Sequence, residues 1–316
     1  MIKVASEISG LSLAPEEIEI VIFNAPNKLS HYLGLYKKRF LTDIAKDKYE
    51  IIICSRGITR DIVKMNLKNL RLIQLLSTGY DGVPIQELRA QGVMVSNAGS
   101  VYAHSIAETV TYGILRYIKK IRTNPNNTTP DLLRRYETTE LFKKHVLIMG
   151  AGNIGRLIAK QLGAFDANID AYDPYAEENI LFGHVLRSKE VLLSELHEYD
   201  FIISTMPLTK ETENFCDNTF FERMKNSSVF YNIGRDGTVI QKDFMNALKH
   251  KTIGAIISEV KPIPFKCLGK YRGLDNVLVL PGIETSSKEC DVRLRNMIQQ
   301  NLIDYLNNKE ISTIVN

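Results

Sequence analysis

The chain has 316 residues, of which 44% are hydrophobic and 24% charged, a composition typical of a soluble globular protein with a large core. Its formal net charge of +4 is too small, and its basic residues are too scattered, for a nucleic-acid-binding surface. No apolar run reaches the roughly 18 residues that a membrane span needs, and the length favours two domains.

The apolar runs alternate with amphipathic stretches along the chain. Runs rich in Ile and Val predict strands at residues 18–23, 51–54, 72–76, 93–95, 146–149, 169–172, 201–204, 229–232, 253–257 and 277–280. Patterns with a helical period predict helices at residues 85–90, 105–119, 153–162, 189–196, 242–249 and 288–307. Because the strands are apolar on both faces and alternate with helices, the sequence predicts an α/β fold with two Rossmann-like, doubly wound parallel sheets.

The four cysteines carry no sign of a metal or disulfide framework. They lie at positions 54, 216, 267 and 290, with no C-x-x-C pair and no metal-ligand spacing. Unpaired, scattered thiols are typical of a reducing compartment. The sequence therefore predicts a cytoplasmic protein without a metal site.

A glycine-rich turn joins the predicted strand at 146–149 to the helix at 153–162. Gly150, Gly152 and Gly155 form the pattern G-x-G-x-x-G, and Asn153 and Ile154 open the helix. The glycines permit a tight turn, close approach of the backbone to a pyrophosphate, and close packing of helix on strand. The free N–H groups and the positive dipole at the helix N-terminus favour the same anion.

An acidic residue follows the next predicted strand. Asp173 lies close to the roughly 20-residue offset that a dinucleotide-binding unit requires. A carboxylate there accepts hydrogen bonds from the ribose hydroxyls and repels a 2′-phosphate, so the sequence predicts NAD rather than NADP. The alternative is a glycine turn in a fold that binds no cofactor.

Further motifs carry a resemblance to one family. Residues 70–81 read LRLIQLLSTGYD, residues 204–209 read STMPLT, and residues 231–237 read YNIGRDG. In the last segment, Asp236 stands where the family described below usually has glycine. Residues 97–108 look like a crossing between two domains into a long helix. Together these segments resemble the D-isomer-specific 2-hydroxyacid dehydrogenases, a family that includes phosphoglycerate, glycerate and D-lactate dehydrogenases.

The resemblance implies roles for individual residues. Arg235 corresponds to the catalytic arginine, whose planar fork can hold the carboxylate and carbonyl of a 2-oxo acid. The loop at 77–79 would offer backbone N–H groups to the substrate carboxylate, which suits an anion. The implied substrate-binding residues are Ser77, Thr78 and Gly79, and the implied residues beside the cofactor are Met206, Pro207, Ile233, Gly234 and Glu259.

The sequence departs from the family at the proton relay. Gly282 occupies the position of the acid/base histidine, and Ile263 falls where the supporting glutamate belongs. Losing general acid/base assistance lowers a rate by roughly 10²–10⁴. Candidate replacements, none of them favoured by the sequence, are His104, Glu284, Lys261, Lys266 and Tyr271.

Three functional hypotheses remain open. The first is an NAD-dependent oxidoreductase acting on a small 2-hydroxy or 2-oxo acid, with an altered proton relay. The second is a catalytically inactive NAD(H)-binding homologue that serves as a sensor or binding partner. The third is a related reaction on a different substrate.

The domain organisation follows from the same resemblance. We expect a flavodoxin-like substrate domain from residues 1–98 plus 285–316, and an NAD-binding Rossmann domain from residues 99–284. The nicotinamide is expected in the cleft between them. The resemblance also implies a homodimer formed through the cofactor domain.

Overall fold

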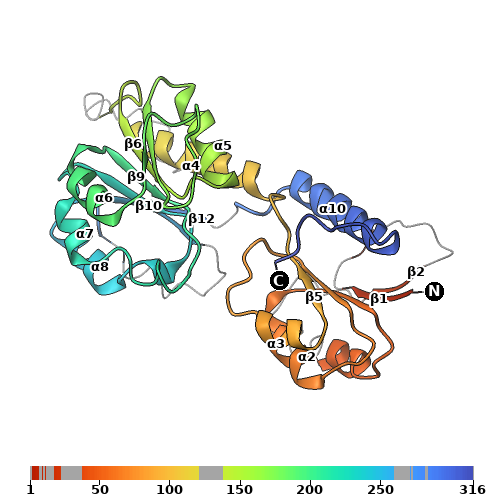
Figure 1. Cartoon of the computed structure of the whole chain (residues 1–316). Coiled ribbons are helices and arrows are strands. Elements are labelled where there is room, and N and C mark those ends of the chain that lie inside the picture. Colours follow the sequence, from red (N-terminus) through yellow and green to blue (C-terminus); the bar gives the residue numbers. More distant parts are fainter. Residues whose placement is uncertain are drawn as a thin grey trace, which may run out of the picture. The chain divides into compact units, whose positions relative to one another are not determined.

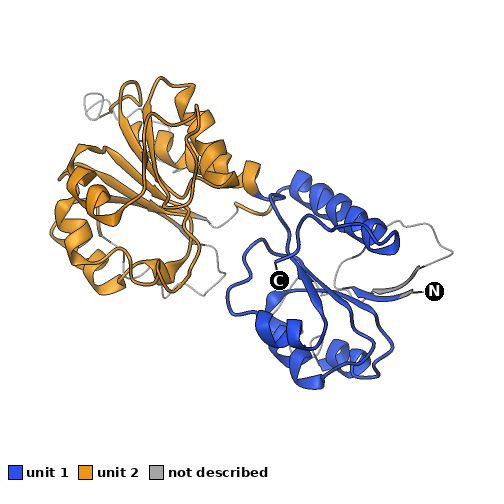
Figure 2. Ribbon diagram, viewed as in Figure 1, with its two compact units in different colours: residues 1–102, 287–316 blue, residues 103–286 orange. Residues whose placement is uncertain are grey.

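The computed structural model forms two compact units, Met1–Tyr102 with Ser287–Asn316 (unit 1) and Ala103–Ser286 (unit 2) (Figure 2). The structure describes residues 2–6, 9, 11, 18–22, 38–120, 138–259, 271, 273–281 and 284–315. The divisions fall after residues 102 and 286, where the sequence suggested 98 and 284.

Unit 1 is built on a five-stranded parallel sheet in the order β2-β1-β3-β4-β5 (Figure 1). The strands are β1 (Ile2–Ser6), β2 (Ile18–Ile22), β3 (Ile51–Cys54), β4 (Leu72–Leu75) and β5 (Met94–Ser96). This 2-1-3-4-5 order is that of flavodoxin-like folds. The sequence did not predict β1, because Lys3 and Ser6 interrupt its apolar run, although Val4 and Ala5 are fully buried.

Helices cover both faces of this sheet. In β3, Ile51 and Ile53 belong to a cluster shared with α10 (Lys288–Leu306), while Ile52 and Cys54 belong to the cluster on the opposite face. That second cluster includes α2 (Thr59–Met65) and α3 (Ile85–Ala90). The last helix of the chain therefore completes the core of the first unit.

Unit 2 is built on a seven-stranded parallel sheet in the order β12-β11-β10-β9-β6-β7-β8. The strands are β6 (His145–Met149), β7 (Asn168–Tyr172), β8 (Val185–Leu186), β9 (Phe201–Ser204), β10 (Val229–Asn232), β11 (Gly254–Glu259) and β12 (Val277–Pro281). Read from β8, this is the 3-2-1-4-5-6 Rossmann order extended by one strand.

The sheet of unit 2 is also apolar on both faces. In β6, Val146 and Ile148 pack with α4 (Ala103–Ile118) and α5 (Asn153–Gly163). Leu147 and Met149 pack on the other face with the cluster that includes α6 (Lys189–Glu195), α7 (Asn218–Arg223) and α8 (Gln241–Lys249). The predicted doubly wound α/β architecture is confirmed.

The strand order of unit 2 reverses at β6. β6 lies between β7 on one side and β9 on the other, so the connections that leave the carboxyl ends of β6 and β9 turn toward opposite faces. In open α/β sheets, ligands bind at such a switch point, outside the carboxyl ends of the strands. The glycine-rich turn directly follows β6 and stands at this place.

Candidate functional site

Two glycines of the turn cannot be replaced without moving the backbone. Gly150 has φ +107°, and a Cβ there would lie 2.6 Å from the Thr205 hydroxyl oxygen. A Cβ on Gly155 would lie 2.0 Å from the carbonyl oxygen of Gly150, so α5 packs directly on the turn. Both observations agree with the structural roles that the sequence predicted.

The middle glycine differs, because a Cβ on Gly152 would meet nothing within 4 Å. Gly152 is exposed and is the N-cap of α5, and no side chain among the described residues caps the helix there. The first N–H groups of α5, beginning with that of Asn153, therefore lie next to the open space at Gly152. Open space and free N–H groups fit a pyrophosphate.

Asp173 is held beside this turn. One carboxylate oxygen accepts a hydrogen bond from the backbone N–H of Ala151 at 3.0 Å, and the other accepts from that of Tyr175 at 3.0 Å. Each oxygen has a second lone pair, and the residue is half-buried. The carboxylate is thus oriented by the backbone and can still accept hydrogen bonds from a ribose.

The ends of β9 and β10 form one continuous surface next to the turn. The backbone N–H groups of Ile233 and Gly234 donate to the Ser204 carbonyl at 2.8 and 3.0 Å. A Cβ on Gly234 would lie 2.5 Å from the Met206 carbonyl oxygen, so the two loops touch. Met206 is buried, while Pro207 is exposed.

Thr205, which sequence reasoning did not single out, connects this surface to the turn. Its hydroxyl lies 3.2 Å from the Met149 carbonyl oxygen and 3.1 Å from that of Gly150. The hydroxyl therefore ties the end of β9 to the first glycine. The sequence signal for Thr205 is its position directly after the apolar strand β9, which lies beside β6 in the sheet.

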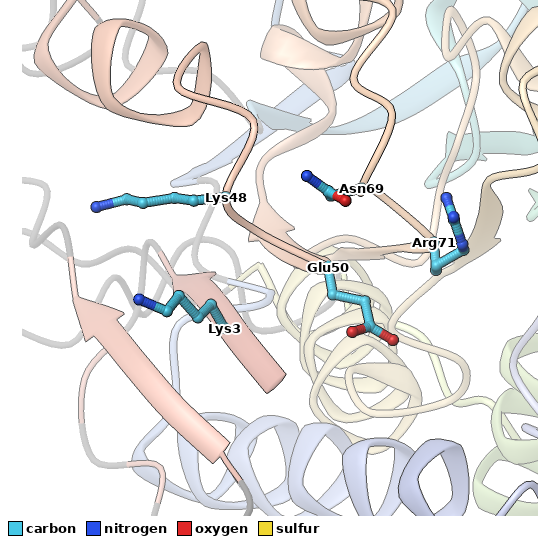
Figure 3. A pocket seen from close by; sticks show the side chains of 5 residues that line it. All are labelled: Lys3, Lys48, Glu50, Asn69 and Arg71. Carbon is cyan, nitrogen blue, oxygen red and sulfur yellow. The ribbon is translucent and has the colours of Figure 1, made fainter. Parts of the chain in front are cut away.

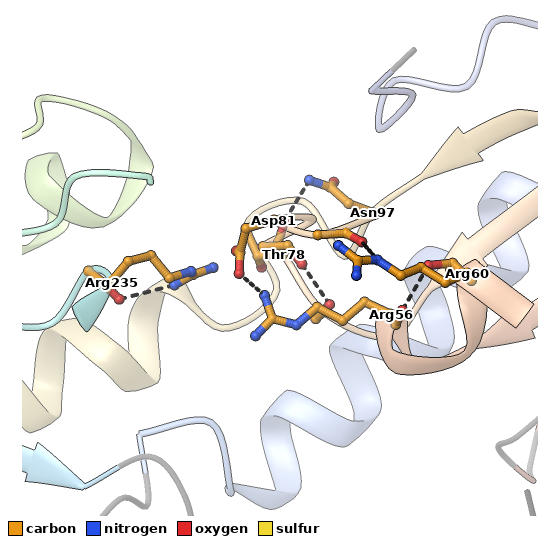
Figure 4. A network of polar contacts seen from close by, with 11 residues as sticks. Arg56, Arg60, Thr78, Asp81, Asn97 and Arg235 are labelled. Carbon is orange, nitrogen blue, oxygen red and sulfur yellow. Dashed lines mark hydrogen bonds and ion pairs between the residues drawn. The ribbon is translucent and has the colours of Figure 1, made fainter. Parts of the chain in front are cut away.

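Arg235 follows β10 on the same edge of the sheet. Its carbonyl accepts hydrogen bonds from the Asn232 side-chain amide at 3.1 Å and the Thr238 hydroxyl at 2.7 Å. The guanidinium Nη1 donates to the Gly234 carbonyl at 3.1 Å, as Figure 4 shows. The Arg235 side chain is half-buried, and its backbone is fixed by the side chains of Asn232 and Thr238.

In unit 1, the loop that contains Ser77, Thr78 and Gly79 follows the carboxyl end of β4. The Ser77 hydroxyl donates to the Gly79 carbonyl at 2.8 Å, and the Thr78 hydroxyl donates to the Gly99 carbonyl at 2.9 Å. The Asn97 side-chain amide donates to the Thr78 carbonyl at 2.8 Å (Figure 4). This network fixes the loop from the end of β5.

The far side of this loop is held by two arginines that the sequence did not indicate. Arg56 forms an ion pair with Asp81, and Arg60 Nε donates to the Gly82 carbonyl at 3.2 Å (Figure 4). Arg56 and Asp81 are 25 residues apart, so no local pattern reveals the pair. The loop is thus supported from both neighbouring strands.

The comparison with known families decides the assignment. Residues 110–283, more than half of the chain, match the NAD-binding domain of the D-isomer specific 2-hydroxyacid dehydrogenases. The chain belongs to this family. The resemblance noted in the sequence is confirmed, and unit 2 carries the family's NAD-binding domain.

Curated relatives are distant but numerous. The chain is 25% identical over 289 residues to a D-3-phosphoglycerate dehydrogenase of Methanocaldococcus jannaschii, covering 90% of this chain but 54% of that protein. It thus spans about half the length of that dehydrogenase. It is 29% identical over 252 residues to a hydroxypyruvate reductase of Thermotoga maritima, covering 77% of this chain and 80% of the relative. A glyoxylate reductase of Pyrococcus furiosus is 24% identical, with coverage of 98% and 92%.

Solved structures show the same fold. An acyclic imino acid reductase in complex with NADPH and D-Arg superposes with a TM-score of 0.80 at 18% identity, covering all of both chains. The NAD-dependent formate dehydrogenase of Staphylococcus aureus in complex with NAD gives 0.75 at 20% identity, covering 100% and 99%. These matches confirm the two-sheet architecture of the family.

The positions at which the sequence predicts a changed proton relay lie largely outside the described residues. Four of these positions are not among the described residues: Gly282, Ile263, Lys261 and Lys266. For Glu259, the structure describes the backbone but not the side chain. Among the other candidates, His104 is exposed near the start of α4 and Tyr271 is half-buried against the core. Glu284 is only 3% exposed.

Unit 1 has an open hollow of about 460 Å³ (Figure 3). It is lined by Lys3, Lys48, Glu50, Asn69 and Arg71. Lys3 is the second residue of β1, and Glu50 and Arg71 directly precede β3 and β4. The hollow is therefore at the amino edge of the sheet. The loop at 77–79 follows the opposite edge.

The described residues show no sign of a metal site or of a membrane-spanning helix. Within the described ranges, no group of three or more His, Cys, Asp and Glu residues could hold a metal ion. Over the same ranges, no helix combines the length and apolarity needed to cross a membrane. Cys54, Cys216 and Cys290 are buried and form no disulfide within the described residues, and burial raises the pKa of the Cys216 thiol.

Proposed function

We propose that this protein is an NAD-dependent oxidoreductase that interconverts a small 2-hydroxy acid and the corresponding 2-oxo acid. The observation that carries the proposal is the edge of the sheet in unit 2. There, the open Gly152 position, the oriented Asp173 carboxylate and the half-buried Arg235 fork follow strands of one sheet. Family membership supports the same reaction class.

NAD(H) supplies or accepts the hydride when it is bound. Gly150, Gly152 and Gly155 allow the backbone to approach the pyrophosphate, and the N–H groups of Asn153 and Ile154 lie in the first turn of α5, where they favour the anion. Asp173 binds the ribose hydroxyls. Its negative charge disfavours the 2′-phosphate of NADP.

Five further residues would orient the nicotinamide. Met206, Pro207, Ile233 and Gly234 belong to the surface formed by the ends of β9 and β10. Glu259 ends β11, the strand beside β10, and takes the place of the family's aspartate. We propose that these residues hold the ring in place from one side.

The substrate would be bound through its charged and polar oxygens. We propose that the backbone N–H groups of Ser77, Thr78 and Gly79 bind the carboxylate. Arg235 would hold the carboxylate and the 2-oxo group with parallel hydrogen bonds, as its planar fork allows. Since two of the relatives are named glyoxylate reductase and hydroxypyruvate reductase, small 2-oxo acids are the first candidates.

The proposal is tested by following NADH absorbance during incubation with a panel of small 2-oxo acids. We expect oxidation of NADH with at least one acid, and a fall in kcat/KM of about 10²–10³ for Arg235→Lys, which keeps the charge and loses the fork. Tight NADH binding without turnover of any acid would instead support the inactive-homologue hypothesis.

We further propose a cytoplasmic homodimer. The implied dimer rests on family membership, and the compartment rests on Cys216 and Cys290, which are buried and form no disulfide within the described residues. Sedimentation at micromolar concentration should give the mass of a dimer, and a monomer would contradict the assembly. Fractionation of source cells should recover the protein in the cytoplasm.

A further inference from the structure

Four buried side-chain oxygens in unit 2 have no hydrogen-bond partner among the described residues. They are Ser204 Oγ, Ser228 Oγ, Asn276 Oδ1 and Glu284 Oε1. Leaving a buried polar atom unpaired destabilises a folded protein, so each such atom in a native structure requires an explanation.

The four atoms divide between the two edges of the sheet. Ser228 and Asn276 directly precede β10 and β12, at the amino edge, which carries none of the dehydrogenase residues. Ser204 ends β9 and Glu284 follows β12, at the carboxyl edge. The carboxyl edge also carries the glycine turn and Arg235.

Among the four, Glu284 is the most costly to bury. A carboxyl group loses more hydration free energy than a hydroxyl or an amide on transfer into a protein interior. Glu284 is 3% exposed, yet Oε1 makes no hydrogen bond within the described chain. Packing alone would favour an apolar residue, so the carboxyl requires a functional explanation.

The place of Glu284 on the sheet supplies that explanation. β12 and β10 are separated by one strand, β11, so their ends lie roughly 10 Å apart at the usual strand spacing. Arg235 lies three residues beyond the end of β10, and its long side chain can reach a small acid within that interval. In the sheet order, β12 lies on one side of β10 and β6 on the other, so Glu284 and the glycine turn follow strands on opposite sides of the strand that Arg235 follows.

We propose that Glu284 is the proton donor and acceptor of the reaction, an inference that rests on the proposed function. During reduction, C2 of the oxo acid would gain the hydride that bound NADH would supply on its oxidation to NAD⁺. The electron pair of the broken carbonyl π bond takes the proton of the Glu284 carboxyl, forming the hydroxyl group. The Glu284 carboxylate then regains a proton from water, and oxidation reverses each step.

The role distinguishes Glu284 from the other candidates on the described chain. His104 is exposed near the start of α4 and needs no special account. Tyr271 packs with the apolar cluster on one face of the sheet. Of these three residues, only Glu284 is a buried ionisable group that has an unpaired atom and lies at the carboxyl edge of the sheet.

Activity measurements test the proton transfer. Glu284→Gln should lower the rate of 2-oxo acid reduction about 10²–10⁴-fold while the Kd for NADH stays within twofold of wild type. Glu284→Asp should retain part of the activity. Glu284→Ala should lose it and regain at least tenfold when formate is added, because formic acid can occupy the space and donate the proton.

Stability measurements provide a readout independent of turnover. Glu284→Met keeps the side-chain length and removes the unpaired carboxyl, so it should raise the melting temperature by about 2–4 °C while abolishing activity. Ser228→Ala is the matched control, since it removes a buried unpaired oxygen at the amino edge. It should match or exceed wild-type stability and leave kcat and KM unchanged.

The outcomes separate this inference from the proposed function. If wild type reduces a 2-oxo acid and Glu284→Gln does so equally fast, the proton role is wrong and the function stands. If Glu284→Met is less stable than wild type, or if no Glu284 variant folds, the carboxyl has a structural role and the inference is overturned. Absence of NADH binding by wild type overturns the proposed function itself.

Discussion

Gly152→Ala should weaken cofactor binding strongly while leaving the protein as stable as wild type. The new Cβ would meet nothing within 4 Å, and the backbone there has φ −74° and ψ −165°, which alanine adopts without strain. Alanine is a poorer N-cap than glycine by up to about 1 kcal/mol. Lower entropy of the unfolded chain offsets about 0.4–1 kcal/mol of that loss, so the free energy of unfolding should change by less than about 0.5 kcal/mol.

Gly155→Ala is the matched comparison. Its Cβ would stand 2.0 Å from the Gly150 carbonyl oxygen, so the turn or α5 must shift. Overpacking of this kind costs about 1–3 kcal/mol of stability. Of the two substitutions, only Gly155→Ala should therefore lower the denaturant midpoint clearly.

The assay pairs calorimetric titration of NADH with urea unfolding of both variants. The methyl group of Gly152→Ala fills the space left for the pyrophosphate, so NADH affinity should fall at least about 30-fold, equivalent to about 2 kcal/mol. Wild-type affinity in Gly152→Ala would refute the placement of the pyrophosphate. A loss of stability equal to that of Gly155→Ala would refute the reasoning from open space.

Three further predictions concern the two units. Asp173→Ser should lower the ratio of the Kd for NADPH to the Kd for NADH at least tenfold, because the repulsion of the 2′-phosphate is lost. An unchanged ratio would show that Asp173 does not contact the ribose. Asn97→Ala removes the hydrogen bond to the Thr78 carbonyl, so the KM for the oxo acid should rise while the Kd for NADH is unchanged. Burial raises the pKa of Tyr102 to about 12, against about 10 unfolded, while its hydroxyl donates to the Leu76 carbonyl. The folded state therefore holds the hydroxyl proton up to a higher pH than the unfolded state does. The contribution of Tyr102 to the free energy of unfolding is complete below pH 10 and disappears as the pH rises toward 12. Tyr102→Phe should lack that part of the alkaline loss of stability in urea titrations; an identical profile would contradict it.

The fold was predictable where the chain is apolar on both faces. The runs at 51–54, 146–149 and 201–204 became strands because every other residue packs against helices on one face and the rest on the other. Short elements were missed. β8, with two residues, is too brief to show a period, and in α7 the buried residues Phe220 and Phe221 are adjacent rather than three or four positions apart, so tertiary packing decides both elements.

The site divides in the same way. The glycine turn and Asp173 were predictable because a local pattern defines them, and the geometry at Gly150 and Gly155 agrees with it. The Arg56–Asp81 pair was not predictable, because folding brings together residues 25 positions apart. Burial of Glu284 was equally hidden, since a glutamate in a polar turn usually points to solvent.

The central claim is that this chain transfers a hydride although the sequence predicts Gly282 at the position of the family's histidine, and it is tested most directly with deuterium. The protein is incubated with NADH deuterated at the transferring position of the nicotinamide and with a 2-oxo acid, and the product is analysed by mass spectrometry and NMR. The account predicts a 2-hydroxy acid that carries one deuterium at C2, in a single configuration. Intact oxo acid beside fully retained label in NADH would contradict it.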